Sequence, residues 1–182
     1  KFHEQIKVAI DRYEAPKINR SDIQNIVICG LGGSGIAGHI IKNYFADKIA
    51  MPVEVVADYV LPKYVSKNTL AIMCSYSGNT EETLNTYAIA REKGAQIIVL
   101  TKGGTIMELA EEHGYTIYKA DGGFQPRVAL GYPMGYLLML FFDLLGQQKK
   151  ADLLVLADKV SNAADYIERS GVLAATFKQT IK

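Results

Sequence analysis

The sequence predicts an α/β fold, a three-layer doubly wound domain built on a five-stranded parallel sheet. Short apolar runs alternate with helical patterns along the chain, and this alternation implies crossover connections between parallel strands. The first, third and fourth runs carry apolar side chains on both faces, as a sheet covered by helices on both sides requires. With 182 residues, of which 49% are hydrophobic, the chain is long enough to bury the core of one sizeable domain.

The predicted elements follow one another in a regular order. Phe2 to Tyr13 has apolar residues at helical spacing and opens the chain with a helix. The five strands are expected at Ile26–Cys29, Val53–Ala57, Leu70–Cys74, Gln96–Thr101 and Tyr115–Tyr118. The later helices are expected at Ser34–Asp47, Thr80–Lys93, Ile106–His113, Val128–Leu145 and Ala151–Arg169.

The clearest break in the chain is the polar segment Gly146–Lys150. We therefore expect residues 1–150 to form one domain that includes the N-terminal helix. Residues 151–182 are expected to be a helical extension leading toward another unit.

Composition excludes several classes of function. The net charge is +1 and the sequence has no basic stripe, which argues against a nucleic-acid partner. The longest apolar run, Tyr136–Phe142, is too short to span a membrane. Cys29 and Cys74 are expected to be free and buried, which fits a reducing cytoplasm. The three histidines lack the spacing of metal ligands, so no metal is expected: His3, His39 and His113.

Two loops have an unusual composition. The glycine-rich loop Cys29–Gly35 follows the first strand, and glycines let backbone N–H groups approach a ligand closely. The loop after the third strand offers the hydroxyl groups of Ser75, Ser77 and Thr80 just before a helix, whose N-terminus favours an anion. Taken alone, the first loop could serve only close packing, and the second could be a helix cap.

The predicted topology brings these two loops together. In a flavodoxin-like sheet of order 2-1-3-4-5, the chain reverses direction between strands one and three, and their loops diverge to leave a crevice where ligands usually bind. Both unusual loops belong to those two strands. The sequence therefore predicts a ligand site between them.

A dinucleotide is one candidate ligand for that site. Gly30, Gly32 and Gly35 fit the pattern G-x-G-x-x-G, and Asp58 stands where an acid could bind the ribose. This interpretation leaves the hydroxyl cluster of the other loop unexplained. Several serine and threonine hydroxyls together suit a terminal phosphate better.

Three segments resemble a known family. "GLGGSGIAG", "CSYSGNTEET" and "FQPRVALGYPMGYL" are similar to the sugar isomerase (SIS) domain of the bifunctional phosphoglucose/phosphomannose isomerases, over roughly Ile26 to Leu145. The resemblance implies that the hydroxyl loop holds a sugar phosphate and that Arg127 stabilises an enediolate intermediate; from the residues alone, Arg127 could equally be a solvated loop residue. It assigns the phosphate to Ser75, Ser77 and Thr80, and the sugar to Gly33 and Ser34.

The resemblance also implies an activity. It predicts aldose–ketose isomerisation between glucose 6-phosphate or mannose 6-phosphate and fructose 6-phosphate, with a hexose 6-phosphate as the bound partner and no metal or nucleotide cofactor. A homodimer in the cytoplasm is expected. In this family the catalytic glutamate, the ring-opening histidine and a lysine lie farther along the chain, the glutamate in a second SIS domain and the histidine in a neighbouring subunit. The chain is therefore expected to be the first domain of a two-domain enzyme.

This chain also contains acid–base candidates of its own, which are weaker than the glutamate and histidine that the resemblance implies. Glu81, Glu82 and His39 are near the two loops, although each is more typical of a solvated helix residue. Two other functions stay open on the residues alone: a non-catalytic sugar-phosphate-binding or regulatory module, and a dinucleotide-dependent oxidoreductase.

Overall fold

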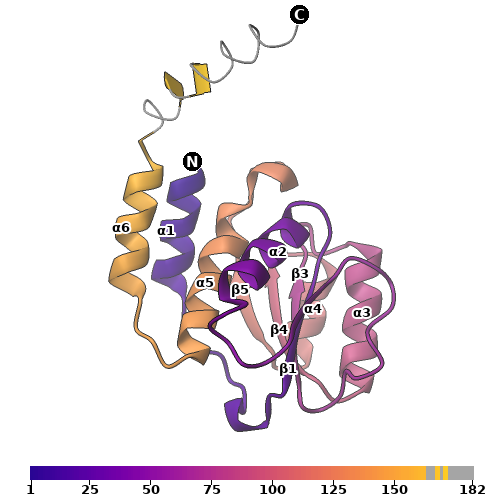
Figure 1. Ribbon diagram of the computed structural model, residues 1–182. Coiled ribbons are helices and arrows are strands. Elements are labelled where there is room, and N and C mark those ends of the chain that lie inside the picture. Colours follow the sequence, from indigo (N-terminus) through magenta and orange to yellow (C-terminus); the bar gives the residue numbers. More distant parts are fainter. Residues whose placement is uncertain (163–166, 169, 172–182) are drawn as a thin grey trace, which may run out of the picture.

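A five-stranded parallel sheet with the order β2-β1-β3-β4-β5 forms the middle layer of the protein (Figure 1). In β1, Ile28 lies opposite Val55 of β2 and Ile72 of β3. The computed structural model describes residues 1–162, 167–168 and 170–171. Its strands are β1 (Asn25–Cys29), β2 (Val53–Val56), β3 (Thr69–Cys74), β4 (Gln96–Thr101) and β5 (Thr116–Lys119). The predicted fold class and strand order are confirmed.

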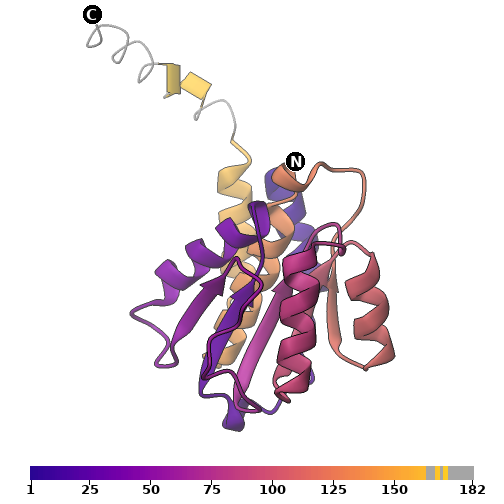
Figure 2. The same ribbon diagram turned by 90° about the vertical axis from the view of Figure 1, so that its right-hand side faces the viewer.

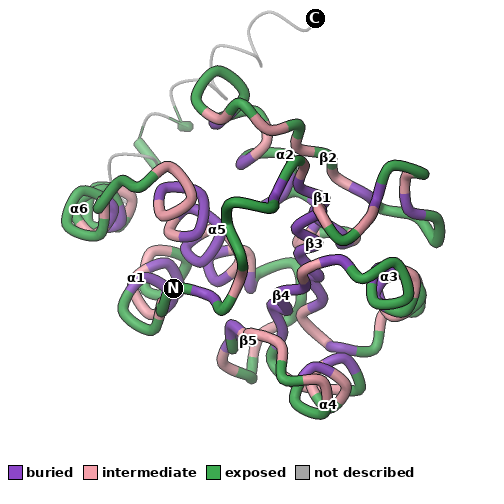
Figure 3. Tube along the Cα trace, turned by 90° about the horizontal axis from the view of Figure 1, so that it is seen from below, coloured by how far each residue is buried: buried purple, intermediate pink, exposed green. Residues whose placement is uncertain are grey.

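Helices cover both faces of the sheet (Figure 3). One face carries α1 (Phe2–Arg12), α2 (Gly33–Phe45) and α5 (Gly131–Leu144), and the other carries α3 (Glu81–Glu92) and α4 (Thr105–Glu112). A sixth helix, α6 (Lys150–Val160), packs against α1, and two short 3-10 helices span Arg20–Asp22 and Pro126–Val128. None of the described helices has the length and apolar character needed to cross a membrane.

The side-chain alternation of the strands divides the core in two. In β1, Ile26 and Ile28 join the apolar cluster under α1, α2 and α5, whereas Val27 and Cys29 join the cluster under α3 and α4. Cys74 lies in the first cluster, on the opposite face from Cys29, and both are free and buried, as predicted. Every residue of β3 is buried, because this central strand is covered on both faces.

Two expected helices differ from the observed ones by more than two residues at one end, whereas the bounds of the other helices agree within two residues. The helix expected from Val128 begins only at Gly131, and the preceding segment Pro126–Val128 is a 3-10 helix. The helix expected over Ala151–Arg169 is found as α6, which buries Leu153 in the same core cluster as α1. The remainder of that expected helix and of the 151–182 extension lies largely outside the described residues. The division of the chain at residue 150 stays a prediction.

A buried glutamine on α1 explains where α5 begins. Gln5 is 1% exposed, and its amide oxygen accepts a hydrogen bond from the backbone N–H of Gly131 at 3.0 Å. Its amide nitrogen donates to the carbonyl oxygen of Val128 at 2.9 Å. One side chain thus satisfies two backbone groups at the junction between the 3-10 helix and α5. Buried backbone groups need such partners, because leaving them unpaired is costly.

We expect Gln5→Met to destabilise the protein by about 2–4 kcal/mol, because it leaves two buried backbone groups unpaired at roughly constant side-chain volume. Urea unfolding of the 182-residue chain measures this change. Gln96 provides a matched control, since its amide accepts from the N–H of Asn19 at 2.6 Å and donates to the carbonyl of Asn19 at 3.0 Å in an exposed position. Water replaces those bonds, so Gln96→Met should cost less than about 1 kcal/mol. Equal losses in both variants would contradict the role of Gln5.

Candidate functional site

The loops after β1 and β3 meet at the carboxyl end of the sheet. β1 leads into α2 on one face, while β3 leads into α3 on the other, so the chain reverses direction between them. The two loops touch, since a Cβ atom added to Gly30 would lie 2.7 Å from the carbonyl oxygen of Cys74. Figure 2 shows the loop that joins β5 to α5 above this same end of the sheet. Three segments that are far apart in the sequence therefore border one crevice.

A pocket lined largely by polar groups lies in this crevice, with an empty volume of about 380 Å³. All five residues predicted to bind the sugar phosphate line it: Gly33, Ser34, Ser75, Ser77 and Thr80. The remaining lining residues are Leu31, Cys74, Tyr76 and Pro126. The structure thus brings together the two loops that the sequence singled out.

Hydrogen bonds within the β3–α3 loop separate the hydroxyl groups by role. The hydroxyl of Ser75 is buried, lies 2.9 Å from the hydroxyl of Thr80, and accepts a hydrogen bond from the N–H of Gly78 at 3.1 Å. The hydroxyl of Ser77 accepts only a long bond of 3.3 Å from the N–H of Asn79. Ser75 therefore shapes the loop, whereas Ser77 and Thr80 are half-buried and retain hydrogen-bonding capacity toward the pocket.

The pocket favours an anion because helices begin at it. Thr80 is the N-cap residue of α3, yet its side chain makes no capping hydrogen bond, so its hydroxyl is not committed to the helix. The first N–H groups of a helix have no intrahelical partner, and the helix dipole places positive charge there. Asn79 caps a different helix, since its side-chain oxygen accepts a bond from the N–H of Thr105 at the start of α4. The helix-cap interpretation of this loop therefore applies to Asn79 and not to Thr80.

Arg127 lies near the pocket but does not line it. The backbone of its loop packs against α2, because a Cβ atom on Gly33 would lie 3.2 Å from the carbonyl oxygen of Pro126 and 3.8 Å from the Cα of Arg127. The side chain is exposed and borders a separate surface pocket with Phe2 and Phe124. Within the described part of the chain, no hydrogen bond or ion pair holds the guanidinium. Arg127 must therefore move its side chain to contact a ligand beside Gly33.

No carboxylate or imidazole is placed for proton transfer in this pocket. Among the residues that line it, none is Asp, Glu or His. His39 and Glu81 are exposed on helix surfaces, and Glu81 accepts a hydrogen bond from Tyr59. Burial raises the pKa of the Cys74 thiol far above its usual range, so this group stays protonated. Over the described residues, no cluster of His, Cys, Asp or Glu is arranged to hold a metal ion.

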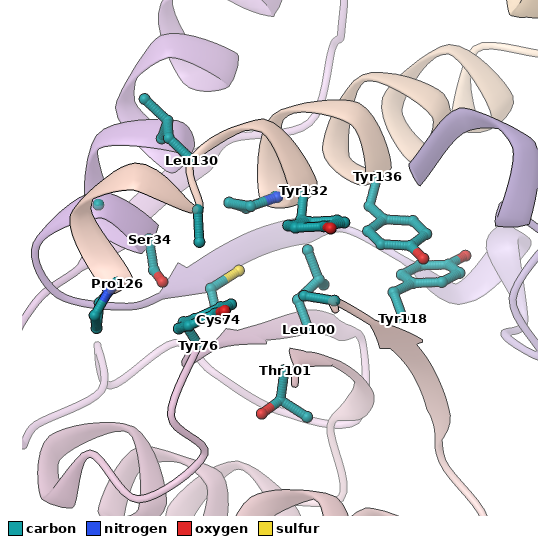
Figure 4. Close-up of a pocket in the computed structure, with 14 residues that line it drawn as sticks. Ser34, Cys74, Tyr76, Leu100, Thr101, Tyr118, Pro126, Leu130, Tyr132 and Tyr136 are labelled. Atoms are coloured by element: carbon teal, nitrogen blue, oxygen red, sulfur yellow. The ribbon is translucent and has the colours of Figure 1, made fainter. Parts of the chain in front are cut away.

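A second, more apolar pocket continues inward from the first (Figure 4). The two share Gly33, Ser34, Cys74, Tyr76 and Pro126. The inner pocket adds aromatic and aliphatic side chains, among them Leu100, Tyr118, Tyr132 and Tyr136. The rings of Tyr118 and Tyr136 stack at 4.9 Å, and desolvation raises the pKa of Tyr132 to about 12, so its hydroxyl remains a donor. This pocket was not predicted from the sequence, although the spacing of Tyr132 and Tyr136 on one helix face was a signal for it.

Comparisons with known proteins identify the family of the chain. A family model described as "SIS domain" matches residues 21–142. A bifunctional phosphoglucose/phosphomannose isomerase of Caldicellulosiruptor bescii is 48% identical over 143 residues, which are 78% of this chain and 42% of that protein. A protein of the same name from Aquifex aeolicus is 41% identical over 69% of this chain and 38% of its own length. The chain thus spans about two fifths of the length of these relatives.

A solved structure supports the fold independently. The structure of a putative phosphosugar isomerase from Bacillus subtilis superposes with a TM-score of 0.64, at 24% identity, over 97% of this chain and 53% of that one. At this identity, the likeness establishes the arrangement of helices and strands.

Proposed function

The chain belongs to the SIS domain family, and on that premise we propose that it is the sugar-phosphate-binding domain of an aldose–ketose isomerase acting on hexose 6-phosphates. The proposed reaction interconverts glucose 6-phosphate or mannose 6-phosphate with fructose 6-phosphate. One observation carries this proposal: the hydroxyl-lined pocket between the β1 and β3 loops, placed at a helix N-terminus and bordered by the loop of Arg127. Relatives named bifunctional phosphoglucose/phosphomannose isomerase, at up to 48% identity, support the choice of reaction.

The pocket suits the phosphate end of such a substrate. Ser77 and Thr80 donate hydroxyl hydrogens to phosphate oxygens, and the first N–H groups of α3, which have no intrahelical partner, add donors without requiring a nearby lysine or arginine. Gly33 and Ser34 line the same pocket from the loop after β1, and we assign the sugar to them. Binding the non-reacting phosphate fixes the reacting carbons in place, so its binding energy contributes to the rate.

The chemistry requires a proton to move between C1 and C2 through an enediolate. A base takes the proton from the carbon next to the carbonyl, and negative charge develops on the carbonyl oxygen. The proton then returns to the former carbonyl carbon, while the hydroxyl proton passes from one oxygen to the other, so that the carbonyl and hydroxyl groups exchange places. We assign Arg127 to the enediolate, because its planar guanidinium presents several donors and keeps its charge. The base is proposed to come from a segment beyond this chain, since none of the described lining residues can serve.

Two finer expectations belong to the same proposal. A homodimer in the cytoplasm fits a small-molecule enzyme with free buried cysteines. The dinucleotide alternative is less favoured, because Asp58 is exposed and its carboxylate accepts a hydrogen bond from the N–H of the adjacent Tyr59 at 2.6 Å. A non-catalytic sugar-phosphate module shares the same pocket and differs only in lacking turnover.

The 182-residue chain is expected to bind glucose 6-phosphate and to show little or no isomerase activity, because its pocket lacks a base. Calorimetry with glucose 6-phosphate, glucose and NAD measures the binding, and a coupled assay for fructose 6-phosphate measures the turnover. The complete protein, assayed in parallel, should be active. Tighter binding of NAD than of glucose 6-phosphate would overturn the proposed ligand. Robust turnover by the short chain would show that its base lies within these residues, and an inactive complete protein would favour the non-catalytic module.

A further inference from the structure

The loop that carries Arg127 is held at both ends by α1 but spans several residues between these anchors. At its start, the carboxylate of Asp121 receives hydrogen bonds from Arg12 at 2.7 Å and from the hydroxyl of Tyr132 at 3.1 Å. At its end, Gln5 holds Val128 and Gly131. The intervening segment contains two successive glycines and no regular structure before Pro126. A third contact is therefore needed to fix its position over the pocket.

Tyr76 supplies that contact from within the β3–α3 loop, to which the proposed function assigns the phosphate. Its hydroxyl donates to the carbonyl oxygen of Asp121 at 2.9 Å and accepts from the N–H of Phe124 at 3.2 Å. One hydroxyl thus closes the turn between these two residues. The ring packs against Ala129 and Tyr132. Tyr76 also lines both parts of the cavity (Figure 4).

Tyr76 belongs to the β3–α3 loop, so its contact links this loop to the loop that carries Arg127. It stands between Ser75, which is buried in the β3–α3 loop, and Ser77, which lines the pocket. Its backbone is also held at the end of β4, because its carbonyl oxygen accepts a hydrogen bond from the N–H of Lys102, the residue that follows this strand. Tyr76 therefore connects the segment that binds the phosphate with the segment that bears the guanidinium.

We propose that Tyr76 is a positioning residue that sets the Arg127 loop at a fixed distance from the bound phosphate. This inference rests on the proposed function, in which Arg127 stabilises the enediolate. The Arg127 side chain is exposed, so only its backbone fixes where the guanidinium can reach. Catalytic groups displaced by about 1 Å can lose on the order of a hundredfold in rate, so the backbone position matters.

The test removes only the hydroxyl. In the complete enzyme, Tyr76→Phe should lower kcat about tenfold or more while KM for glucose 6-phosphate changes less than about threefold, because the phosphate-binding hydroxyls stay in place. Tyr87→Phe is the matched control: like Tyr76, Tyr87 uses its hydroxyl in two hydrogen bonds, but these go to Leu109 and His113, away from the pocket. That control should keep kcat within about twofold of the parent.

A double-mutant cycle separates positioning from a general structural role. If Tyr76 acts through Arg127, Tyr76→Phe should have almost no further effect on kcat in an Arg127→Ala background, because interacting residues are non-additive. An unchanged kcat in Tyr76→Phe, a rise in KM alone, or the same fold loss in both backgrounds would each overturn the proposal.

Amide exchange gives a readout that does not depend on the function. In the 182-residue chain, Tyr76→Phe should speed hydrogen exchange at the N–H of Phe124, which loses its acceptor, while Tyr87→Phe leaves it unchanged. Faster exchange with unaltered kcat would overturn the positioning role and leave the proposed function standing. Unaltered exchange would overturn the contact itself. If Arg127→Ala alone left kcat unchanged, the assignment of Arg127 would fail instead.

Discussion

The double variant Ser77→Ala/Thr80→Ala is expected to lose its affinity for glucose 6-phosphate by about a hundredfold or more, since each hydrogen bond to a charged group contributes about 1.5–3 kcal/mol. Both hydroxyls line the pocket, and neither is committed to a capping bond. Calorimetry on the 182-residue chain measures the change. Inorganic phosphate should show the same relative loss, because the proposed function assigns the removed groups to the phosphate and not to the sugar.

Ser75 is left intact in this experiment for a structural reason. Its hydroxyl accepts the N–H of Gly78, so its removal would disturb the loop as well as the ligand contact. The control Ser21→Ala/Ser161→Ala removes two exposed hydroxyls elsewhere, and it should bind as tightly as the parent. If Ser77→Ala/Thr80→Ala kept its affinity and its unfolding midpoint, the phosphate would bind at another place.

The position of the pocket could be predicted from the sequence because it depends on strand order. The alternation of strands and helices predicts a doubly wound parallel sheet, and in the flavodoxin-like order of such a sheet the two distinctive loops follow strands that pair directly. The residues that line the pocket from these loops, such as Gly33 and Ser77, were therefore accessible to sequence reasoning. The buried strands that precede these loops could also be predicted, because each is an apolar run in the sequence.

The contacts that hold the loop between β5 and α5, which carries Arg127, could not be predicted from the sequence. Gln5 bonds to partners 123 and 126 positions away, and Tyr76 to partners 45 and 48 positions away, and no local pattern encodes such pairs. A signal for Gln5 did exist, since it is a polar residue beside the apolar stripe of α1. The side-chain direction of Arg127 was also out of reach, because packing does not constrain an exposed side chain.

Arg127→Ala in the complete enzyme is expected to lower kcat by about a hundredfold or more, which is the usual loss when one oxyanion donor is removed. KM should change much less, because the negative charge develops only along the reaction path and the phosphate contacts remain. Arg127→Lys keeps the charge but loses the planar fork, so it should restore only part of the rate. Steady-state kinetics in the aldose-to-ketose direction measures both variants.

Because Arg127 is exposed, this experiment can separate an effect on kcat from an effect on stability. Its replacement should leave the unfolding midpoint nearly unchanged, because no described residue holds the guanidinium and surface substitutions cost little, within about 0.5 kcal/mol. Arg91→Ala removes another exposed arginine, at the end of α3, and should leave kcat within about twofold of the parent. A fall in kcat without a fall in stability therefore identifies a group that acts on the substrate. If Arg127→Ala and Arg127→Lys both kept kcat within a fewfold of the parent, Arg127 would be an ordinary solvated loop residue, and the enediolate would need another donor.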